Sequence, residues 1–211
     1  MPTHNSPYSA SFTAAGMMYS EMLVVVPMLL KSNDPQTINS LVEDSSLLKI
    51  KSVSARKRVM VEFTRRFGAV SPDFWTAFLG LPEAEQRLAL FFVLLKTYPL
   101  LFHFQTSLAL PKYSSIDRRL SARDVLFTLE ELAAADPFVD SWTDLTRGKI
   151  ASSFVTMLKQ GGLIDLTTGE LAQPQVPDDA FIPYVKSGDI WFLQTCFLPQ
   201  YKVQQIKQLA L

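Results

Sequence analysis

Apolar residues recur at helical spacing in most segments of the chain, and this pattern predicts an all-α, mainly helical protein. The clearest example lies within Lys51–Val70, where Val59, Met60, Phe63 and Phe67 fall on one face of an amphipathic helix. The other face of the same segment is rich in basic residues.

The first half of the chain is expected to form a helical bundle. Tyr8–Lys31 has the pattern of one helix, which Pro27 must kink or break because proline lacks a backbone N–H and clashes with the preceding turn. A loop with capping residues and a proline then leads into a short helix at about Gln36–Glu43. A further short helix is expected after Ser71.

The apolar run Leu88–Leu110 could be mistaken for a membrane span, which needs ~20 predominantly apolar residues with few charges. Lys96 would cost roughly 3 kcal/mol at the centre of a bilayer, and Pro99 would break the helix. We therefore expect two consecutive buried helices and no membrane partner. A true span stays the less favoured alternative.

The best candidate for an interdomain linker is Pro111–Ser115. It predicts a division into an N-terminal helical bundle at residues 1–112 and a second subdomain at residues 113–211. The second subdomain is expected to contain one helix from Ser121 to Pro137 and another over about Leu145–Gln160, which the pair Gly161-Gly162 ends.

A small β-hairpin is expected after that helix. The stretch LIDLTTGELAQPQV predicts two short strands around Thr167-Thr168-Gly169. The order helix, turn, helix, hairpin is typical of a winged helix-turn-helix, whose second paired helix enters the major groove of DNA. Two or three short helices are expected over Pro177–Leu211.

Hydrophobic residues make up 48% of the 211 residues, which is enough for a substantial core. Basic and acidic residues number 20 each, so a case for nucleic-acid binding must rest on local clustering of charge. Cys196 is the single cysteine, and its apolar neighbours favour a buried, inert thiol. With no disulfide possible and no secretory signal at the start, a cytoplasmic location is expected.

Motifs for common enzyme chemistry are missing from the sequence, which contains no glycine-rich phosphate loop, no G-x-S-x-G and no CxxC. The two histidines, His4 and His103, cannot supply a His/Cys metal site or a plausible triad, and His103 is expected in the core. We expect no catalytic residue, no metal and no cofactor. An enzyme using only carboxylates, such as Glu130 and Glu131, stays an alternative.

The first candidate surface for nucleic acid is the helix within Leu145–Gln160. Its apolar side carries Ile150, Phe154, Met157 and Leu158, and Arg147 near that side is expected to pin the helix to its neighbours. The opposite side has no acid, and small polar side chains there would let the helix approach a groove closely. Its members are Lys149, Ser152, Ser153, Thr156, Lys159 and Gln160.

The predicted hairpin weakens this first case in one respect. Thr167 and Thr168 would stand at the tip of a wing, but Asp165 and Glu170 flank them, which disfavours insertion into the minor groove. Winged-helix folds also serve as protein-docking modules, and a Ser/Thr/Lys face can be an ordinary solvated face. Both alternatives stay open.

The second candidate surface is the basic segment Lys49–Arg66, in which Glu62 is the single acid. Arg58 and Arg65 are seven residues apart and so share a helix face, which suits phosphate binding. The alternative is a solvated face paired with acids from elsewhere in the fold. The predicted DNA contacts on this segment are Lys51, Lys57, Arg58, Arg65 and Arg66.

Three stretches resemble, in order along the chain, the BrxA family of the BREX bacteriophage-exclusion systems. They are YSASFTAAGMMYSEMLVVVPMLL, LLKIKSVSARKRVMVEFTRRF and SWTDLTRGKIASSFVTMLKQGGLID. The likeness spans nearly the whole chain and includes no catalytic signature. The positions that carry the family's pattern are Lys51, Ser52, Arg56, Trp142, Thr146, Arg147 and Lys149.

The resemblance implies a small, mostly helical, cytoplasmic protein encoded beside a methyltransferase, a large ATPase and a phosphatase-like protein. It also implies binding of double-stranded DNA without enzymatic activity, and an N-terminal helical bundle similar to the antitermination protein NusB. The residues and the resemblance together predict a non-enzymatic DNA-binding accessory subunit of a phage-defence system, with a winged-helix-like C-terminal part. The alternative is a protein-only scaffold that docks the other BREX components.

Overall fold

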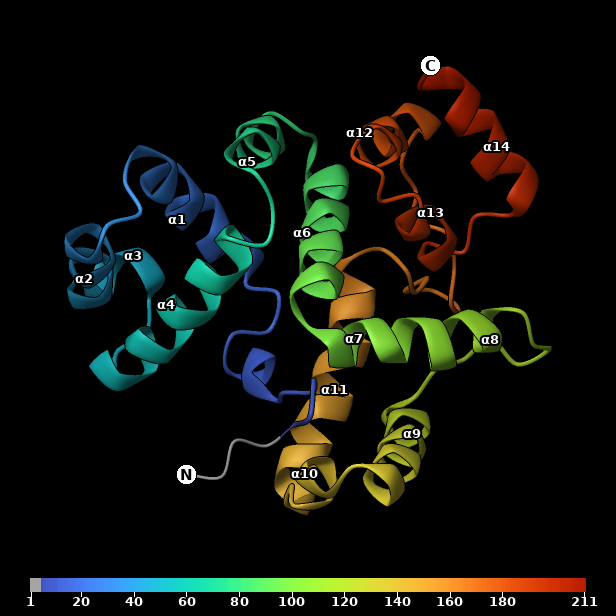
Figure 1. The fold of residues 1–211 in the computed structure, drawn as a ribbon, viewed down its shortest axis with the longest axis horizontal. Coiled ribbons are helices and arrows are strands. Elements are labelled where there is room, and N and C mark those ends of the chain that lie inside the picture. The colour runs from blue at the N-terminus through green and yellow to red at the C-terminus, as the bar shows by residue number, and fades with distance from the viewer. Residues whose placement is uncertain (1–4) are drawn as a thin grey trace. The chain divides into compact units, whose positions relative to one another are not determined.

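The computed structural model describes residues 5–211, and within that range the chain forms helices and no β-strand (Figure 1). The predicted all-α class is therefore confirmed. Inter-residue contacts divide the chain into two compact units. The N-terminal unit is Ser9–Tyr98, and the C-terminal unit is Pro99–Leu211 together with residues 5–8.

This division falls between Tyr98 and Pro99, ahead of the expected boundary at residues 112 and 113. Part of the expected linker is helical, because Pro111 lies inside the short helix α8 (Leu110–Tyr113). The expected boundary at residues 112 and 113 stays a prediction.

The N-terminal unit begins with a 3-10 helix and continues with six α-helices. They are η1 (Ser11–Ala14), α1 (Tyr19–Lys31), α2 (Pro35–Glu43), α3 (Ser45–Leu48), α4 (Val53–Phe67), α5 (Pro72–Leu79) and α6 (Glu83–Thr97). Side-chain caps fix several starts: Asp34 accepts from the N–H of Thr37 at 2.7 Å, and Ser71 accepts from the N–H of Phe74 at 3.3 Å. Trp75 is fully buried and donates its indole N–H to the carbonyl of Phe67 at 3.0 Å.

The first predicted helix differs from the observed chain. Tyr8–Lys31 was expected to be one helix interrupted at Pro27, but Pro27 lies inside α1 and the interruption comes earlier. Gly16 and Met18 adopt left-handed backbone conformations, with φ of 54° and 47°, so the chain turns between η1 and α1. A left-handed methionine is not foreseeable from sequence, because only glycine adopts this region without a steric penalty.

A buried arginine holds the connection between α2 and α4. Arg56 is 3% exposed. Its guanidinium donates to the carbonyl of Val42 and, at 2.6, 2.9 and 3.3 Å, to the carbonyls of Ile50, Lys51 and Glu43. One side chain on α4 thus satisfies backbone acceptors at the end of α2 and in the segment that leads into α4.

The C-terminal unit is built from the continuous helical run Pro99–Tyr113, two further long helices, α9 and α11, and several short ones. They are α7 (Pro99–Phe104), the π-helical segment η2 (Gln105–Ala109), α8, α9 (Ala122–Ala135), α10 (Pro137–Asp140), α11 (Asp144–Gln160), the 3-10 helix η3 (Asp178–Phe181), α12 (Ile182–Lys186), α13 (Trp191–Thr195) and α14 (Gln200–Leu209). The rings of Phe104 and Phe154 pack with centroids 5.3 Å apart and join α7 to α11. Gln105 is fully buried and donates its amide to the carbonyl of Thr195 at 2.6 Å.

The short segment of residues 5–8 belongs to this unit through Tyr8. Its hydroxyl lies 3.4 Å from Nδ1 of His103 on α7, and the two rings meet edge to face with centroids 5.8 Å apart. The chain therefore passes from the C-terminal unit to the N-terminal unit after Tyr8 and returns after Tyr98.

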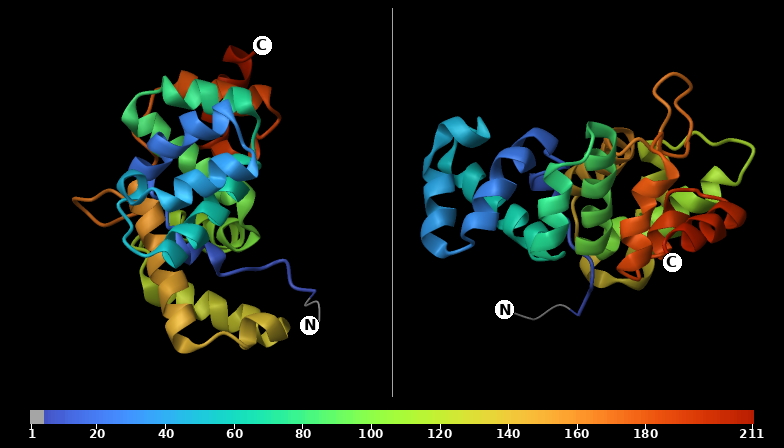
Figure 2. Two further views of the ribbon diagram at one scale, coloured as in Figure 1. Left: turned by 90° about the vertical axis from the view of Figure 1, so that its left-hand side faces the viewer. Right: turned by 90° about the horizontal axis from the view of Figure 1, so that it is seen from above.

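The predicted β-hairpin is wrong in its secondary structure. Among the described residues the segment after α11 forms only isolated antiparallel bridges, Ile164↔Leu171 and Arg119↔Glu170, and the chain between Ile164 and Leu171 projects as a loop (Figure 2). The pairing ends after one bridge because Asp165 draws the next residues into a turn. Its carboxylate accepts from the N–H groups of Thr167 and Thr168 at 2.7 and 3.0 Å.

The long apolar run is confirmed as two consecutive helices, α6 and α7, separated at Tyr98. Within residues 5–211 no single helix is long and apolar enough to cross a membrane, although the bent pair Glu83–Thr97 and Pro99–Tyr113 passes a test of length and composition when taken together.

Replacing Arg56 with alanine is expected to lower the free energy of unfolding by about 3 kcal/mol or more, because four backbone carbonyls, at least one of them buried, would lose a donor at once. The matched control is Lys57→Ala, which removes an exposed charge from the neighbouring position and should change stability by about 0.5 kcal/mol or less. Urea unfolding followed by circular dichroism measures both variants. Equal effects of the two substitutions would contradict the structural role of Arg56.

Candidate nucleic-acid interface

Helix α11 presents its polar residues to solvent as its sequence predicts. Ile150, Phe154, Met157 and Leu158 are at most 1% exposed, so the expected apolar side is confirmed as the buried side. Of the six predicted contact residues, four are exposed and two are half-buried. The exposed ones are Lys149, Ser152, Thr156 and Lys159, and the half-buried ones are Ser153 and Gln160.

The start of α11 is fixed by two side chains. Thr143 caps it by accepting from the N–H of Thr146 at 3.2 Å. Arg147 donates to the carbonyl of Trp142 at 3.1 Å and to the carbonyl and carboxylate of Asp140 at 2.9 and 3.2 Å. Arg147 therefore ties the helix to the turn before it, as the sequence indicates, and its guanidinium is occupied.

The two exposed hydroxyl groups on the outer face of α11 already have acceptors. Ser152 donates to the carbonyl of Lys149 at 3.1 Å, and Thr156 donates to the carbonyl of Ser152 at 2.8 Å. To donate to a phosphate, each hydroxyl would have to rotate away from its own helix. Within residues 5–211 no ion pair is found for Lys149 or Lys159, so their ammonium groups are the donors most directly available.

The loop beside α11 carries negative rather than positive charge at its base. Asp165 accepts the N–H groups of Thr167 and Thr168, and Gly169, with φ of 73°, closes the turn by donating to the carbonyl of Asp165 at 2.8 Å. The hydrogen bond from the backbone N–H of Thr168 is the largest cause that lowers the pKa of Asp165 below its ordinary value, and the one from the N–H of Thr167 is the next. The carboxylate of Asp165 therefore orders the loop and gives it a negative charge.

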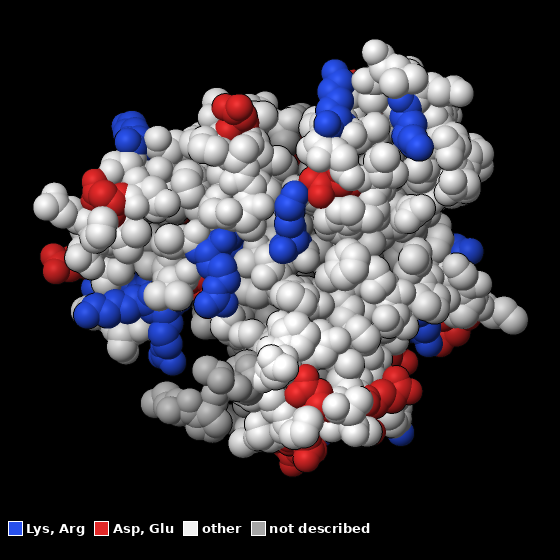
Figure 3. Space-filling view, viewed as in Figure 1, with Lys and Arg blue, Asp and Glu red and all other residues white. Residues whose placement is uncertain are grey.

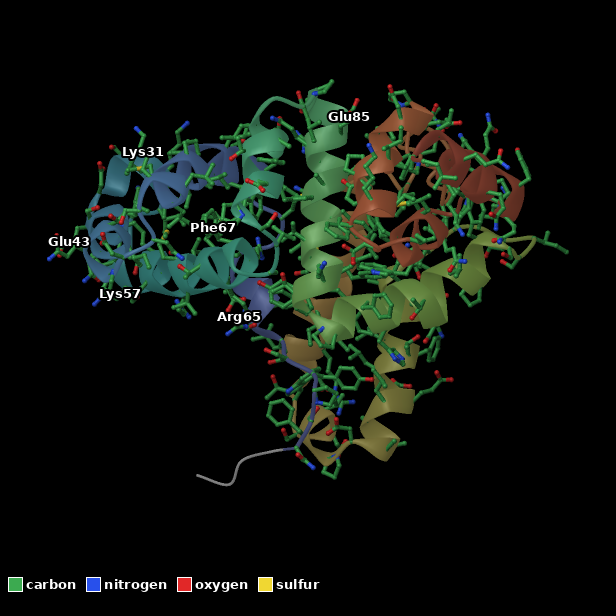
Figure 4. The ribbon with its side chains drawn as sticks, turned by 45° about the horizontal axis from the view of Figure 1, so that its top comes forward. Lys31, Glu43, Lys57, Arg65, Phe67 and Glu85 are labelled. Carbon is green, nitrogen blue, oxygen red and sulfur yellow. The ribbon has the colours of Figure 1, made fainter. Side chains whose placement is uncertain are left out.

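The basic helix of the N-terminal unit is α4, and part of its predicted surface is outside. Blue side chains gather over α4 on the face in Figure 3, and Lys57 and Arg65 project from its outer side in Figure 4, whereas Phe67 points into the unit. Lys51, Lys57, Arg58 and Arg65 are exposed.

Arg66 does not belong to that surface, which corrects the prediction that placed it beside Arg65. It is 1% exposed, because its position on the helix falls on the same side as Phe63 and Phe67. Its Nε donates to the hydroxyl of Tyr98 at 3.0 Å, and its guanidinium carbon lies 5.5 Å from the centroid of the Tyr98 ring. A guanidinium in this position could reach a phosphate only if α4 separated from the helices that pack against it.

Glu62 is the acid that balances this buried arginine. Its carboxylate accepts the hydroxyl of Tyr98 at 2.7 Å and that of Ser11 at 3.2 Å. The pKa of Tyr98 is raised to about 12, mainly because the ring is buried. The hydrogen bond to Glu62 is a smaller cause in the same direction. Tyr98 is therefore a neutral link between Arg66 and Glu62.

Arg65 is exposed but engaged. Its Nη1 lies 3.4 Å from the carboxylate of Glu62 and donates to the hydroxyl of Ser11 at 2.7 Å. Arg56, one of the positions that carries the family resemblance, is also directed inward. Of the predicted contact residues on this segment, the cations without a partner among the described residues are Lys57 and Arg58 on α4 and Lys51 just before it.

The structure also contains a feature that the sequence did not indicate. An open groove of about 280 Å³ lies beside Arg58 in the N-terminal unit. Its wall depends on the left-handed turn at Met18, for which the sequence holds no signal. The groove and the α11 face belong to different units.

The remaining candidate chemistry is structural. Cys196 is fully buried, which confirms the predicted burial, and this burial raises the pKa of its thiol and so disfavours the reactive thiolate. His103 is half-buried beside Tyr8 rather than in the core, and burial lowers its pKa. His4 lies outside the described residues. Within those residues no group of three or more His, Cys, Asp or Glu is placed to hold a metal ion.

The Asp165 turn should respond to pH with a definite sign. Its pKa is lowered in the folded protein, so its contribution to the turn is present above its ordinary pKa and is lost as pH falls through the lowered value. We expect the amide proton resonance of Thr168 to titrate below the ordinary carboxyl range in NMR spectra. Asp165→Asn should abolish this titration, and a midpoint at the ordinary carboxyl value would refute the assignment.

Comparisons with known proteins agree with the fold and with the resemblance described above. The solved structure of an uncharacterized protein from Magnetospirillum magneticum is similar, with a TM-score of 0.76 at 20% sequence identity. That alignment covers 90% of this chain and 98% of the other, and at this identity it shows the fold alone. No curated protein matches the sequence.

The sequence model of the BrxA family matches residues 6–184, which is most of the chain. The matched range contains all three stretches on which the resemblance rests. This protein therefore belongs to the BrxA family and is a phage-defence protein associated with BREX systems.

Proposed function

We propose that this protein is a non-catalytic, cytoplasmic subunit of a BREX system that binds double-stranded DNA through helix α11. The single observation that carries the proposal is the outer face of α11, which holds six polar residues, two of them lysines, and no acid. Cationic and small polar side chains on an exposed helix face are the groups that contact phosphates and base edges in a groove.

The dimensions of α11 suit this role. The helix has 17 residues and is therefore about 25 Å long, and Lys149 and Lys159 are about 15 Å apart along its axis. The major groove of B-DNA is about 12 Å wide. Lysines with this separation can reach the phosphates that border the groove while Thr156, near the middle of the face, lies against the bases.

The order of the elements supports a reduced winged helix-turn-helix. Helices α9, α10 and α11 follow one another, and α10 and α11 both pack against α9. The bridge Arg119↔Glu170 joins the segment before α9 to one side of the loop after α11, and Ile164↔Leu171 joins the two sides of that loop to each other. A full wing would extend this pairing. The acidic base of the loop favours a minor role for it in binding.

We propose a mainly electrostatic contact with modest sequence preference, because the hydroxyls of Ser152 and Thr156 are committed to their own helix in the free protein. Other BREX components are the natural protein partners, and the methyltransferase, the ATPase and the phosphatase-like subunit are the proposed ones. Docking of these subunits on the α11 face, without DNA, is the alternative that the experiments below distinguish.

Binding to a duplex is expected to weaken steeply with salt, with a slope of log affinity against log salt near roughly −0.9 for each phosphate neutralised. The double variant Lys149→Ala/Lys159→Ala should reduce the magnitude of that slope by about two. The matched control, Lys186→Ala/Lys207→Ala, removes two lysines from α12 and α14 of the same unit and should leave it unchanged. Fluorescence anisotropy with a labelled duplex measures all three proteins; equal slopes would remove α11 from the interface.

The predicted contribution of α4 is measured in the same titration. Lys51 and Lys57 are exposed and unpaired within residues 5–211, so Lys51→Ala/Lys57→Ala is expected to reduce the slope by about one to two if they neutralise phosphates. Arg66→Ala is expected to act differently, by lowering the urea midpoint through the loss of its buried contacts. A slope unchanged in the lysine variant would exclude α4 from the DNA contact.

A further inference from the structure

The groove beside α4 combines an apolar floor with one cationic wall. Its volume is about 280 Å³, and it is open on one side. It is lined by Ala14, Met18, Ile50, Ala55, Arg58 and Val59. Arg58 is the one charged residue among them, and none of them is aromatic or acidic.

Met18, which lines the groove, and Lys49, the neighbour of the lining residue Ile50, adopt unusual backbone conformations. Among the described residues, non-glycine residues with positive φ are Met18, Lys49 and Phe197, with φ of 47°, 52° and 64°. Met18 lines the groove, and Lys49 directly precedes Ile50, which also lines it. Strained residues of this kind persist only where the surrounding structure determines them, and they gather at ligand-binding positions.

The wall at Ile50 is also fixed from inside the unit. The guanidinium of Arg56 donates to the carbonyl of Ile50 at 2.6 Å and to that of Lys51 at 2.9 Å. Because this guanidinium is buried, the segment cannot shift without leaving it unsatisfied. The groove is therefore preformed, which lowers the entropic cost of binding a ligand.

The charge around the groove is positive. Arg58 has no ion pair among residues 5–211, and the exposed side chains of Lys49 and Lys51 flank Ile50 in sequence. Glu62, the acid of α4, is buried and engaged by Tyr98 and Ser11, so it does not neutralise this surface.

We propose that this groove binds an acidic peptide segment of a protein partner. One large apolar side chain of the segment lies on the floor formed by Met18, Ala55 and Val59, and a neighbouring carboxylate pairs with Arg58. A planar guanidinium matches a carboxylate with two parallel hydrogen bonds. This surface lies in the N-terminal unit and goes beyond the DNA contact proposed for α11.

The lining favours a peptide over nucleic acid. A duplex presents phosphates and no apolar group that could fill a concave floor. Single-stranded nucleic acid is bound mainly by stacking of bases on aromatic side chains, and the groove has none. An amphipathic or extended peptide supplies both the apolar anchor and the acid, which is the common composition of anchor sites at protein interfaces.

The test is selection of peptides from a random 12-residue library displayed on phage, carried out in parallel on the full-length protein and on Ala55→Leu. Leucine fills the floor and keeps the helix and its cap, because the Ser52 cap uses only the backbone N–H of residue 55. The wild-type protein should enrich peptides in which acids flank one large apolar residue, and Ala55→Leu should not. Enrichment of no such peptides, or equal enrichment on both proteins, would overturn the proposal.

An enriched peptide, synthesised with a fluorophore, then separates the contributions by anisotropy. Ala55→Leu and Arg58→Glu should each weaken its binding about tenfold or more. The matched charge reversal Lys57→Glu, which lies outside the lining, should change it less than threefold, and circular dichroism verifies the fold of each variant. Equal loss in Lys57→Glu would reduce the site to general charge attraction and refute the apolar groove.

The same variants also show whether the groove binds nucleic acid instead of a peptide. Anisotropy with labelled duplex and single-stranded DNA should show no effect of Ala55→Leu, because the α11 contact lies in the other unit. A loss of DNA affinity in Ala55→Leu would overturn the peptide proposal in favour of nucleic acid. Failure of DNA binding in Lys149→Ala/Lys159→Ala leaves the peptide result intact, so the two proposals fail independently.

Discussion

Three charged side chains of a single helix, α4, are buried, and the N-terminal unit is organised around the need to compensate them. An isolated charge in a protein interior is strongly unfavourable unless hydrogen bonds or an opposite charge replace its lost hydration. Arg56 binds backbone carbonyls, whereas Arg66 and Glu62 are joined through the hydroxyl of Tyr98. These requirements fix the segment before α4, the start of η1 at Ser11 and the end of α6 at Tyr98 in one arrangement.

The same requirement separates the two basic surfaces that the sequence suggests. On α4, charge is divided between the inside, where it determines structure, and the outside, where Lys57 and Arg58, with Lys51 just before the helix, stay free to interact. On α11 the division is complete, because the buried side is apolar and the cations and hydroxyls of Lys149, Ser152 and Thr156 face solvent. The two helices therefore suit different ligands: α11 a regular array of phosphates, and α4 a ligand that also fills an apolar hollow.

The sequence predicts the regular parts of this structure well, for physical reasons. Apolar spacing and caps such as Thr143 and Ser71 are local signals, and they locate α5, α9 and α11 and the buried side of α11 correctly. The inward direction of Arg66 was open to prediction too, because it shares a helix side with Phe63, but the excess of positive charge in the segment suggested a surface. The left-handed Met18, the fourfold role of Arg56 and the loss of the hairpin to the Asp165 turn depend on tertiary partners or single backbone angles, which local pattern does not encode.

The pairing of Tyr8 with His103 gives the chain an unusual connectivity, because it assigns the N-terminal residues to the unit formed mostly by the C-terminal half. Two peptide connections, after Tyr8 and after Tyr98, therefore join the units. A single proteolytic cut after Tyr8 leaves Ser9–Tyr98 joined to Pro99–Leu211, and a single cut after Tyr98 leaves it joined to the segment that contains Tyr8. Only cleavage at both places frees Ser9–Tyr98 from every covalent link to the other unit. In evolutionary terms the N-terminal unit has the topology of an insertion, which could be gained, exchanged or lost as one cassette between two neighbouring points of a host fold.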